Sequence, residues 1–166
     1  MNINLGAGDR YADGWTNVDW PGSPHRKDET VDLTGPLPWE PGSVELAYAG
    51  HVLEHLTLDD CHHLLTHLRP CMALDGALLV VGPDLDRART LLAAGALDVT
   101  LDSLLYGADR WPGDQHLWEC TPDIIVELLT ATGWQGIHEV GIGEVDAVWP
   151  VADRGPIWQC AIGARP

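Results

Sequence analysis

Three features of the sequence predict an α/β protein with a mostly parallel sheet. Short apolar segments typical of strands alternate with amphipathic helical segments, and right-handed crossovers turn that order into parallel strands. Glycines follow the first segment at once, at Gly6 and Gly8. Residues 77–81 form a continuous apolar run, as in a central strand buried on both faces. We therefore expect a seven-stranded, mostly parallel sheet with an antiparallel last strand and helices on both faces.

The length of 166 residues suits one domain over residues 1–166, because two typical domains need a longer chain. The first strand is expected near the N-terminus with no helix before it, so the fold is N-terminally minimal. The expected strands are 3–5, 15–18, a brief extended piece ending at Leu33, 44–49, 77–81, 136–140 and 157–162. The last two look like an antiparallel pair at the edge of the sheet.

Four helices are expected between these strands. Thr57 is a plausible N-cap, with Asp60 three residues later and Pro70 as the stop. Thr121 precedes a proline and an acid, a strong helix start, and Gly133 suits the position after the helix end. The expected helical ranges are 58–69, 85–94, 97–106 and 122–132.

The charge excludes several classes of partner. Lys+Arg number 9 and Asp+Glu number 25, so the formal net charge is -16. Sequence-independent binding to nucleic acid needs clustered basic residues, and so does docking on an anionic membrane surface. A small cationic ligand remains compatible with this acidic protein.

Compartment signals are consistent with a cytoplasmic protein. No stretch approaches the ~20 apolar residues of a membrane span, and the N-terminus lacks the basic and apolar regions of a secretory signal. The four cysteines form no Cys-x-x-Cys pair, so we expect reduced, partly buried thiols. They are Cys61, Cys71, Cys120 and Cys160.

A ligand is expected at the carboxyl ends of the strands. Gly6 and Gly8 follow the first strand and let a ligand approach the backbone closely, while Asp19 ends the second and can accept ribose hydroxyls. Gly8 and Asp19 are only 11 positions apart, against about 20 in dinucleotide sites. The interval has no room for a full crossover helix, which makes NAD and FAD poor candidates. A nucleoside cofactor without phosphates, such as S-adenosylmethionine, fits better.

An ordered set of short motifs covers nearly the whole chain. They are Asn4-Leu5-Gly6-Ala7-Gly8, Gly14-Trp15-Thr16-Asn17-Val18-Asp19, Asp32-Leu33, Pro36-Leu37-Pro38-Trp39, Ser43-Val44-Glu45, His51-Val52-Leu53-Glu54-His55, Pro83-Asp84-Leu85, His116-Leu117-Trp118 and Thr121-Pro122-Asp123. In this order they resemble class I S-adenosylmethionine-dependent methyltransferases, most of all a small branch often associated with sugar and surface-polysaccharide modification. The resemblance implies a Rossmann-like fold and methyl transfer to a small-molecule or carbohydrate acceptor, as O-methylation.

The same resemblance implies a cofactor site. The glycine loop would lie against the methionine part of S-adenosylmethionine, Asp19 would hold the ribose, and Asp32 with Leu33 would flank the adenine. Asn4 stands where the family usually has an acid, and Ala73-Leu74-Asp75-Gly76 replaces the usual Lys-Pro-Gly-Gly turn. The expected cofactor-binding residues are Asn4, Gly6, Ala7, Gly8, Asp19, Asp32, Leu33, His51 and Val52. Asp19 and Asp32 could instead be solvated turn residues.

Three residues are candidate catalytic groups, because a base helps when the acceptor is a hydroxyl. They are His51, Asp84 and His116, each in a loop expected at the carboxyl ends of the strands. His116 is favoured on the substrate side, with a structural loop histidine as the alternative. The expected substrate-binding residues are Tyr106, Arg110, Trp111 and Trp118. The two tryptophans could instead fill the core, and the arginine could simply pair with acids on the protein surface.

Two other functions stay open. His51-Val52-Leu53-Glu54-His55 matches His-x-x-Glu-His, the inverted zinc-protease motif, in which a helix would place both histidines on one face with Glu54 as base. Because a strand precedes the motif, zinc hydrolysis is a minor alternative and no metal ligand is assigned. The second alternative is a non-catalytic module of the same fold that binds a partner. A second subunit, as in a homodimer, could supply cover for the cofactor.

Overall fold

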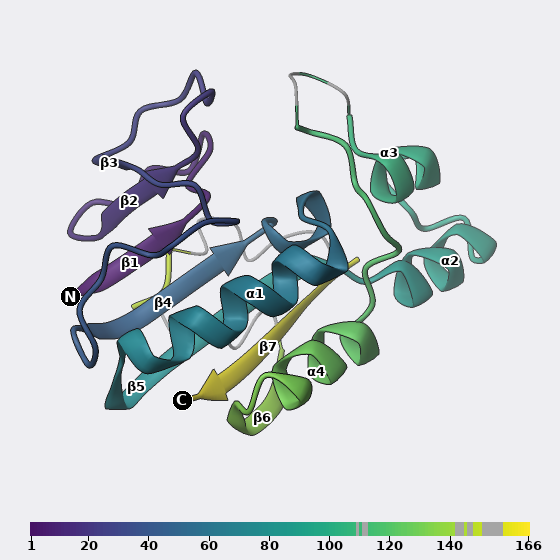
Figure 1. Ribbon diagram of the computed structural model, residues 1–166. Helices are drawn as coiled ribbons and strands as arrows, with labels where there is room; N and C mark the ends of the chain where they lie inside the picture. The colour runs from purple at the N-terminus through teal and green to yellow at the C-terminus, as the bar shows by residue number, and fades with distance from the viewer. Residues whose placement is uncertain (109, 111–112, 142–144, 146–147, 151–157) are drawn as a thin grey trace.

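The computed structural model describes residues 1–108, 110, 113–141, 145, 148–150 and 158–166 (Figure 1). Within these residues one seven-stranded sheet has the order β3-β2-β1-β4-β5-β7-β6. The strands are β1 (Asn2–Leu5), β2 (Thr16–Asp19), β3 (Glu29–Thr30), β4 (Val44–Gly50), β5 (Met72–Pro83), β6 (Gln135–Val140) and β7 (Gln159–Arg165).

The strand directions confirm the predicted sheet. β1 pairs in parallel with β2 and β4, β2 with β3, and β4 with β5. β7 is antiparallel to both of its neighbours, β5 and β6. The carboxyl ends of β1, β2, β4 and β5 therefore meet at one edge of the sheet, where the predicted ligand site lies.

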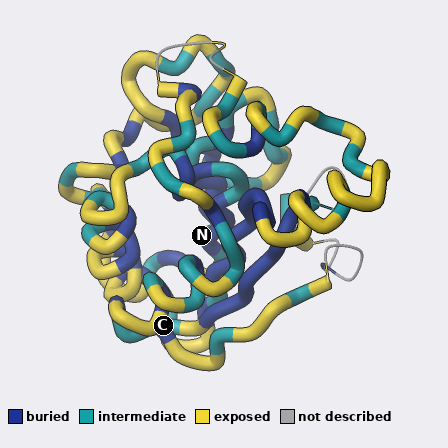
Figure 2. Tube along the Cα trace, turned by 90° about the vertical axis from the view of Figure 1, so that its right-hand side faces the viewer, coloured by how far each residue is buried: buried dark blue, intermediate teal, exposed yellow. Residues whose placement is uncertain are grey.

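The helices α1 (Leu58–Leu68) and α4 (Pro122–Ala131) begin at the predicted caps. The Thr57 side chain accepts a hydrogen bond from the Asp60 amide, and the Thr121 side chain accepts one from the Ile124 amide. Gly133 follows α4 with a φ of +84°, as expected for a residue after a helix end. Both helices cover the same face of the sheet (Figure 1), and buried residues concentrate in the strands (Figure 2).

The alternating side chains of β5 separate the two faces of the sheet. Leu78 and Val80 join the core beneath α1 and α4, whereas Leu79 and Val81 join a smaller apolar cluster on the opposite face. Complete burial of such a side chain contributes about 1.5–3 kcal/mol. The described members of the smaller cluster are Trp15, Tyr48, Leu79, Val81, Val140, Val145, Trp149 and Ala161.

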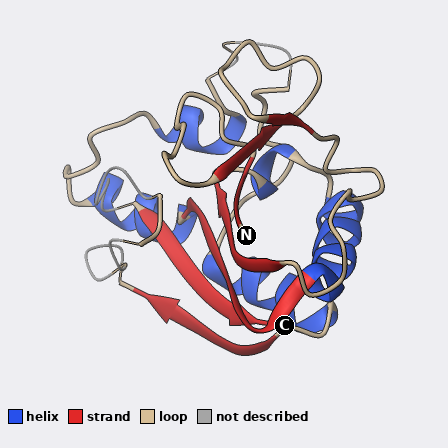
Figure 3. Cartoon of the chain, turned by 90° about the vertical axis from the view of Figure 1, so that its left-hand side faces the viewer, coloured by secondary structure: helices blue, strands red, loops and turns tan. Residues whose placement is uncertain are grey.

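The described members of this smaller cluster belong to strands and loops. The connections from β1 to β2, β2 to β3 and β3 to β4 are loops (Figure 3). They are too short or too rich in proline and glycine for crossover helices. Side chains of loops and strands therefore provide the apolar cover on this side.

Two further helices, α2 (Leu85–Ala93) and α3 (Leu101–Tyr106), pack together through Leu85, Ala88 and Leu104. The predicted helix over 97–106 is too long, because Thr100 caps α3 by accepting from the Ser103 amide. Single 3-10 turns are formed by η1 (Leu53–His55) and η2 (Arg69–Cys71).

A polar network that is buried at Asn4 and Asn17 and exposed at Asp28 supports the short connection between β1 and β2. Asn4 Nδ2 donates to Asn17 Oδ1 and to the carbonyl of Arg10, at 2.9 Å each. Asp28 Oδ2 accepts from the backbone amide and from Nδ2 of Asn17, at 2.8 and 2.9 Å. Tyr11 donates to the other oxygen of Asp28 at 2.6 Å. Side chains thus hold in place a loop that has no helix of its own.

All four cysteines are free thiols, and they are buried, whereas the sequence predicts partly buried thiols. Burial raises the pKa of the Cys61 and Cys160 thiols to about 12, so both stay protonated and unreactive near neutral pH. Within the described part of the chain, no helix is both long and apolar enough to cross a bilayer.

The network around Asp28 predicts a pH-dependent stability. Hydrogen bonds from Tyr11 and Asn17 lower the pKa of Asp28 to about 2, so its contribution is present above its ordinary pKa of about 4 and is lost as the pH falls toward 2. Asp28→Asn should lower the melting temperature at pH 7. The difference in melting temperature between this variant and the unmodified protein should disappear between about pH 4 and 2.

Asp75→Asn is the control, because Asp75 is an exposed acid of β5. Thermal unfolding followed by circular dichroism from pH 7 to 2 measures both variants. A gap for Asp28→Asn that stays constant down to pH 2 would contradict the assigned hydrogen bonds.

Candidate functional site

The loop after β1 forms a tight backbone cradle. Gly6 and Gly8 have φ values of +58° and +53°, a region that favours glycine. The Gly8 amide donates to Asp19 Oδ2 at 3.1 Å, so the predicted glycine loop and the predicted acid are in direct contact. Ala7 is buried between the two glycines, and its amide donates to the Val18 carbonyl.

The cradle lies directly against the segment that follows β4. A Cβ atom placed on Gly6 would be 2.7 Å from Val52 Cγ2, closer than real Cβ contacts allow. Only a glycine lets the two segments approach this closely. The residues predicted to contact the methionine part and the sulfonium of a cofactor are therefore neighbours in space.

Asp19 is a buried acid at the end of β2, 6% exposed. Its Oδ2 accepts from the Gly8 amide and from the Ser23 hydroxyl at 2.6 Å, and its Oδ1 accepts from the Trp20 amide at 2.8 Å. The Ser23 hydroxyl makes the kind of hydrogen bond that a ribose hydroxyl would make. These contacts are not those of a solvated turn residue.

The other predicted residues of the cradle have more local roles. Asp32 is exposed, and its Oδ1 accepts from the amide and hydroxyl of Thr34 at 2.9 and 2.7 Å. These hydrogen bonds lower the pKa of Asp32. Its contacts are those of a turn residue, the alternative left open by the sequence. Leu33 beside it is buried in the main core.

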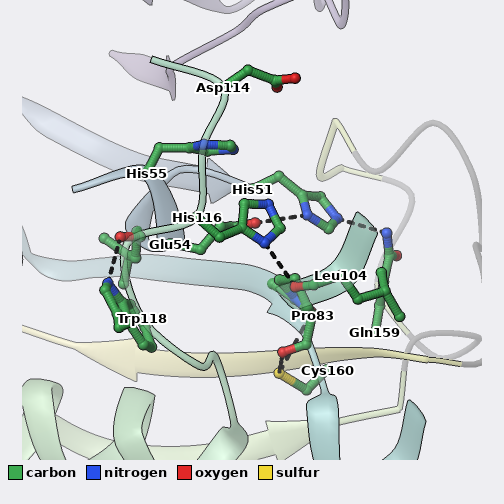
Figure 4. Close-up of polar contacts among 12 residues, drawn as sticks. His51, Glu54, His55, Pro83, Leu104, Asp114, His116, Trp118, Gln159 and Cys160 are labelled. Atoms are coloured by element: carbon green, nitrogen blue, oxygen red, sulfur yellow. Dashed lines mark hydrogen bonds and ion pairs between the residues drawn. The ribbon is translucent and has the colours of Figure 1, made fainter. Parts of the chain in front are cut away.

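His51 lies where β4 ends, and its ring connects two distant parts of the chain (Figure 4). It has a φ of +56°, unusual for a residue other than glycine. Its Nδ1 lies 2.9 Å from Glu54 Oε1, and its Nε2 lies 2.6 Å from Gln159 Nε2. The side-chain amide nitrogen of Gln159 can only donate, so neutral His51 accepts at Nε2 and donates from Nδ1 to Glu54.

Glu54 is a buried acid at the centre of this group, with 1% of its side chain exposed. Burial acts to raise the pKa of Glu54, but the hydrogen bond from His51 and the positive charges that His51 and His55 can carry outweigh it. The net effect is a lowered pKa, so Glu54 is an ionised carboxylate near neutral pH.

His55 and His116 complete the group from two different segments. Their rings meet edge to face with centroids 4.9 Å apart. His55 Nδ1 lies 3.2 Å from the Gln115 carbonyl, and His116 Nδ1 lies 2.8 Å from the Leu104 carbonyl. Burial lowers the pKa of His116, which favours its neutral ring. Ligand atoms of Glu54, His55 and His116 all lie within 4.8 Å of one another.

The predicted substrate-binding residues that the structure describes have different surroundings. Arg110 forms a bidentate pair with buried Asp114, at 3.0 Å for each side-chain contact. Trp118 packs against the main core and donates to the Leu53 carbonyl at 3.1 Å, which matches its core alternative. Tyr106 is 66% exposed. Trp111 lies outside the described residues.

Asp84, a predicted catalytic candidate, acts as the N-cap of α2. Its Oδ1 accepts from the Arg87 amide at 2.9 Å, and only 8% of the residue is exposed. This capping contact is a structural one, and it leaves His51 and His116 as the more central of the three candidates.

The geometry of the inverted zinc-protease motif is not formed. The motif needs one helix over residues 51–55, but only Leu53–His55 form a 3-10 turn. His51 turns toward Gln159, and the metal-ligand group that does form replaces it with His116.

Sequence patterns missed three residues of this region. Gln159 holds His51 from β7, Asp114 holds Arg110, and Ser23 donates to Asp19. None belongs to a motif that predicts its contact. Only the predicted antiparallel last strand pointed to Gln159, because such a strand begins at the edge of the sheet where β5 ends.

Comparison with known proteins identifies the fold. No family model matches the chain, and no curated protein sequence matches it. The chain is similar in structure to human N-acetylserotonin methyltransferase in complex with SAM, with 19% identity and a TM-score of 0.58 over 99% of this chain and 46% of that one.

Two microbial structures are similar over more of their own length. A SAM-dependent methyltransferase from Archaeoglobus fulgidus has 13% identity and a TM-score of 0.65, covering 99% of this chain and 85% of that chain. One from Mesorhizobium loti has 19% identity and a TM-score of 0.60, covering 99% and 90%. The chain thus has the Rossmann-like fold of class I methyltransferases, and it spans less than half the length of the human enzyme.

The close contact between Gly6 and Val52 predicts that an alanine at position 6 destabilises the protein more than an alanine at a glycine with open space around it. A left-handed backbone costs an alanine about 1–2 kcal/mol, and overpacking adds about 1–3 kcal/mol. Gly6→Ala should therefore lower the free energy of unfolding more than Gly95→Ala, because Gly95 has a φ of +67° but open space around it. Urea unfolding measures both.

Val52→Ala tests whether the Val52 side chain is the reason that Gly6→Ala destabilises the protein. Adding Gly6→Ala to a Val52→Ala background should cost less than adding it to the unmodified protein, because the methyl group in the way is gone. Equal costs in the two backgrounds would show that the cradle and the segment after β4 do not meet.

Proposed function

We propose that this chain is a S-adenosylmethionine-dependent methyltransferase that acts on a hydroxyl of a small-molecule or carbohydrate acceptor. The observation that carries the proposal is the contact between buried Asp19 and the Gly8 amide, at the carboxyl ends of adjacent parallel strands. The similarity to the human enzyme, whose structure is in complex with SAM, supports the same cofactor.

The cradle suits the separate parts of S-adenosylmethionine. Backbone between Gly6 and Gly8 receives the methionine part, and the Asp19 carboxylate takes the ribose hydroxyls in place of Ser23. Adenine lies beside Leu33 and Asp32. The sulfonium then lies near Val52 and His51, which directly adjoin the glycine loop.

Methyl transfer is an in-line displacement that depends on position more than on covalent help from the protein. The acceptor oxygen bonds to the methyl carbon as the carbon–sulfur bond breaks, and the electron pair of that bond stays on sulfur, yielding S-adenosylhomocysteine. His51 is suited to receive the acceptor proton, because Glu54 holds its Nδ1–H and leaves Nε2 as the basic nitrogen. Gln159 then yields its place at Nε2 to the acceptor hydroxyl.

The charge of the protein narrows the range of possible methyl acceptors. A formal net charge of -16 repels polyanions, so DNA, RNA and anionic membranes are poor partners. A neutral or cationic small molecule, or a sugar, meets no such barrier. Exposed Tyr106 offers an aromatic face on which a sugar ring can stack.

Calorimetry with S-adenosylmethionine and S-adenosylhomocysteine tests the cofactor site. We expect binding by the unmodified protein and a loss of about 10–100-fold in affinity for Asp19→Ala, because charged hydrogen bonds are worth about 1.5–3 kcal/mol. Asp13→Ala is the matched control, since it removes an exposed acid from the loop between β1 and β2, a few residues before Asp19.

No heat of binding at millimolar ligand with a folded protein would overturn the proposal. Transfer of labelled methyl from S-adenosylmethionine to a panel of sugars and small hydroxyl compounds then tests catalysis. Cofactor binding with no transfer to any acceptor would favour the non-catalytic module.

A further inference from the structure

The group formed by Glu54, His55 and His116 has the composition of a metal site. The first two residues come from η1, and the third comes from the loop after α3. Each offers one ligand atom, and the three atoms all lie within 4.8 Å of one another. Two imidazole nitrogens and a carboxylate oxygen are a common ligand set for Zn²⁺ and neighbouring divalent transition metals.

Both histidines are oriented as metal-binding histidines usually are. A carbonyl oxygen can only accept a hydrogen bond, so the Nδ1 atoms of His55 and His116 must be the donors to Gln115 and Leu104. Each neutral ring therefore keeps its lone pair on Nε2. Backbone carbonyls that hold the opposite ring nitrogen in this way are typical partners of metal-ligating histidines.

Glu54 supplies an independent sign that a ligand belongs here. Its Oε1 accepts the hydrogen bond of His51, but among the residues that the structure describes its buried Oε2 has no hydrogen-bond partner. A buried carboxylate oxygen without a partner is costly. A cation at this position would compensate for that cost.

Neighbouring groups do not compete for the same role. Asp114 points away from the three residues (Figure 4) and is held by Arg110 through both oxygens. His51 uses its two ring nitrogens for Glu54 and Gln159. Among the residues that the structure describes, the ligand set is therefore one acid and two histidines.

We propose that Glu54, His55 and His116 bind one divalent transition-metal ion, with Zn²⁺ as the best match. Metal–ligand distances of about 2.0–2.1 Å place tetrahedral ligands about 3.4 Å apart, so small side-chain rotations close the site. Three protein ligands leave one position open, as in catalytic zinc sites. If the proposed function holds, that position takes the acceptor oxygen, because Glu54 and His55 are only two and three residues after Val52 of the cofactor cradle.

Metal binding is measured on tag-free, chelator-treated protein without S-adenosylmethionine. Competition with a colorimetric zinc indicator should show one tight Zn²⁺ site per chain, and Co²⁺ should give the visible absorption of a low-symmetry site. His55→Ala and His116→Ala should each weaken Zn²⁺ binding about 100-fold or more, because losing a ligand exceeds the 10–100-fold effect of losing an outer partner.

His67→Ala is the matched control. His67 is an exposed histidine of α1 stacked on His63, and that pair is another place where metal could bind weakly. Its loss should leave the tight site unchanged. Glu54→Gln tests the carboxylate, with circular dichroism to show that the variant folds.

The proposal is overturned if the unmodified protein binds Zn²⁺ no tighter than His116→Ala, or if His67→Ala causes the larger loss. Calorimetry with S-adenosylmethionine separates the two proposals. Zinc binding without cofactor binding would leave the metal site standing and overturn the methyltransferase. Cofactor binding without zinc binding would do the reverse.

Discussion

The buried carboxylate of Glu54 is the constraint on which the geometry of the site depends. An ionised acid that is 1% exposed needs donors or cations around it, and His51 and His55 both act to lower the pKa of Glu54. His51 donates from its Nδ1, which fixes the ring where β4 ends. His55 and His116 each have a ligand atom within 4.8 Å of a Glu54 oxygen, and their Nδ1 atoms contact backbone carbonyls. One desolvated charge thus orders residues from three segments of the chain.

The same turn anchors the long connection that follows α3. The Glu54 carbonyl accepts from the Leu117 amide at 2.8 Å, and the Trp118 indole donates to the carbonyls of Leu53 and Leu56. These bonds tie the segment before α4 to the turn that carries Glu54. They also explain why Trp118 packs against the core, since its indole N–H bonds to the turn.

Local sequence patterns predicted the helix starts that depend on contacts between residues close in the sequence. The caps at Thr57 and Thr121 were correct because each depends on an amide three residues away. The start of the third helix was misplaced because Thr100 offers an equally local cap that the apolar pattern hides. The smaller apolar cluster could not be read from local patterns, because it is assembled from side chains of strands and loops that lie far apart in the sequence. Gly8 and Asp19 were placed together because adjacent parallel strands end side by side.

The sequence by itself determined the order of strands and helices, the parallel sheet, the glycine loop and the acid beside it. Each of these follows from periodicity, capping and turn chemistry within a few residues. Tertiary structure alone decided which partner each polar side chain has: His51 contacts Gln159 from the far end of the chain, and His116 rather than His51 joins Glu54 and His55. Such choices depend on strand register and on where a long connection crosses, because buried polar groups must find partners wherever the packed backbone brings them.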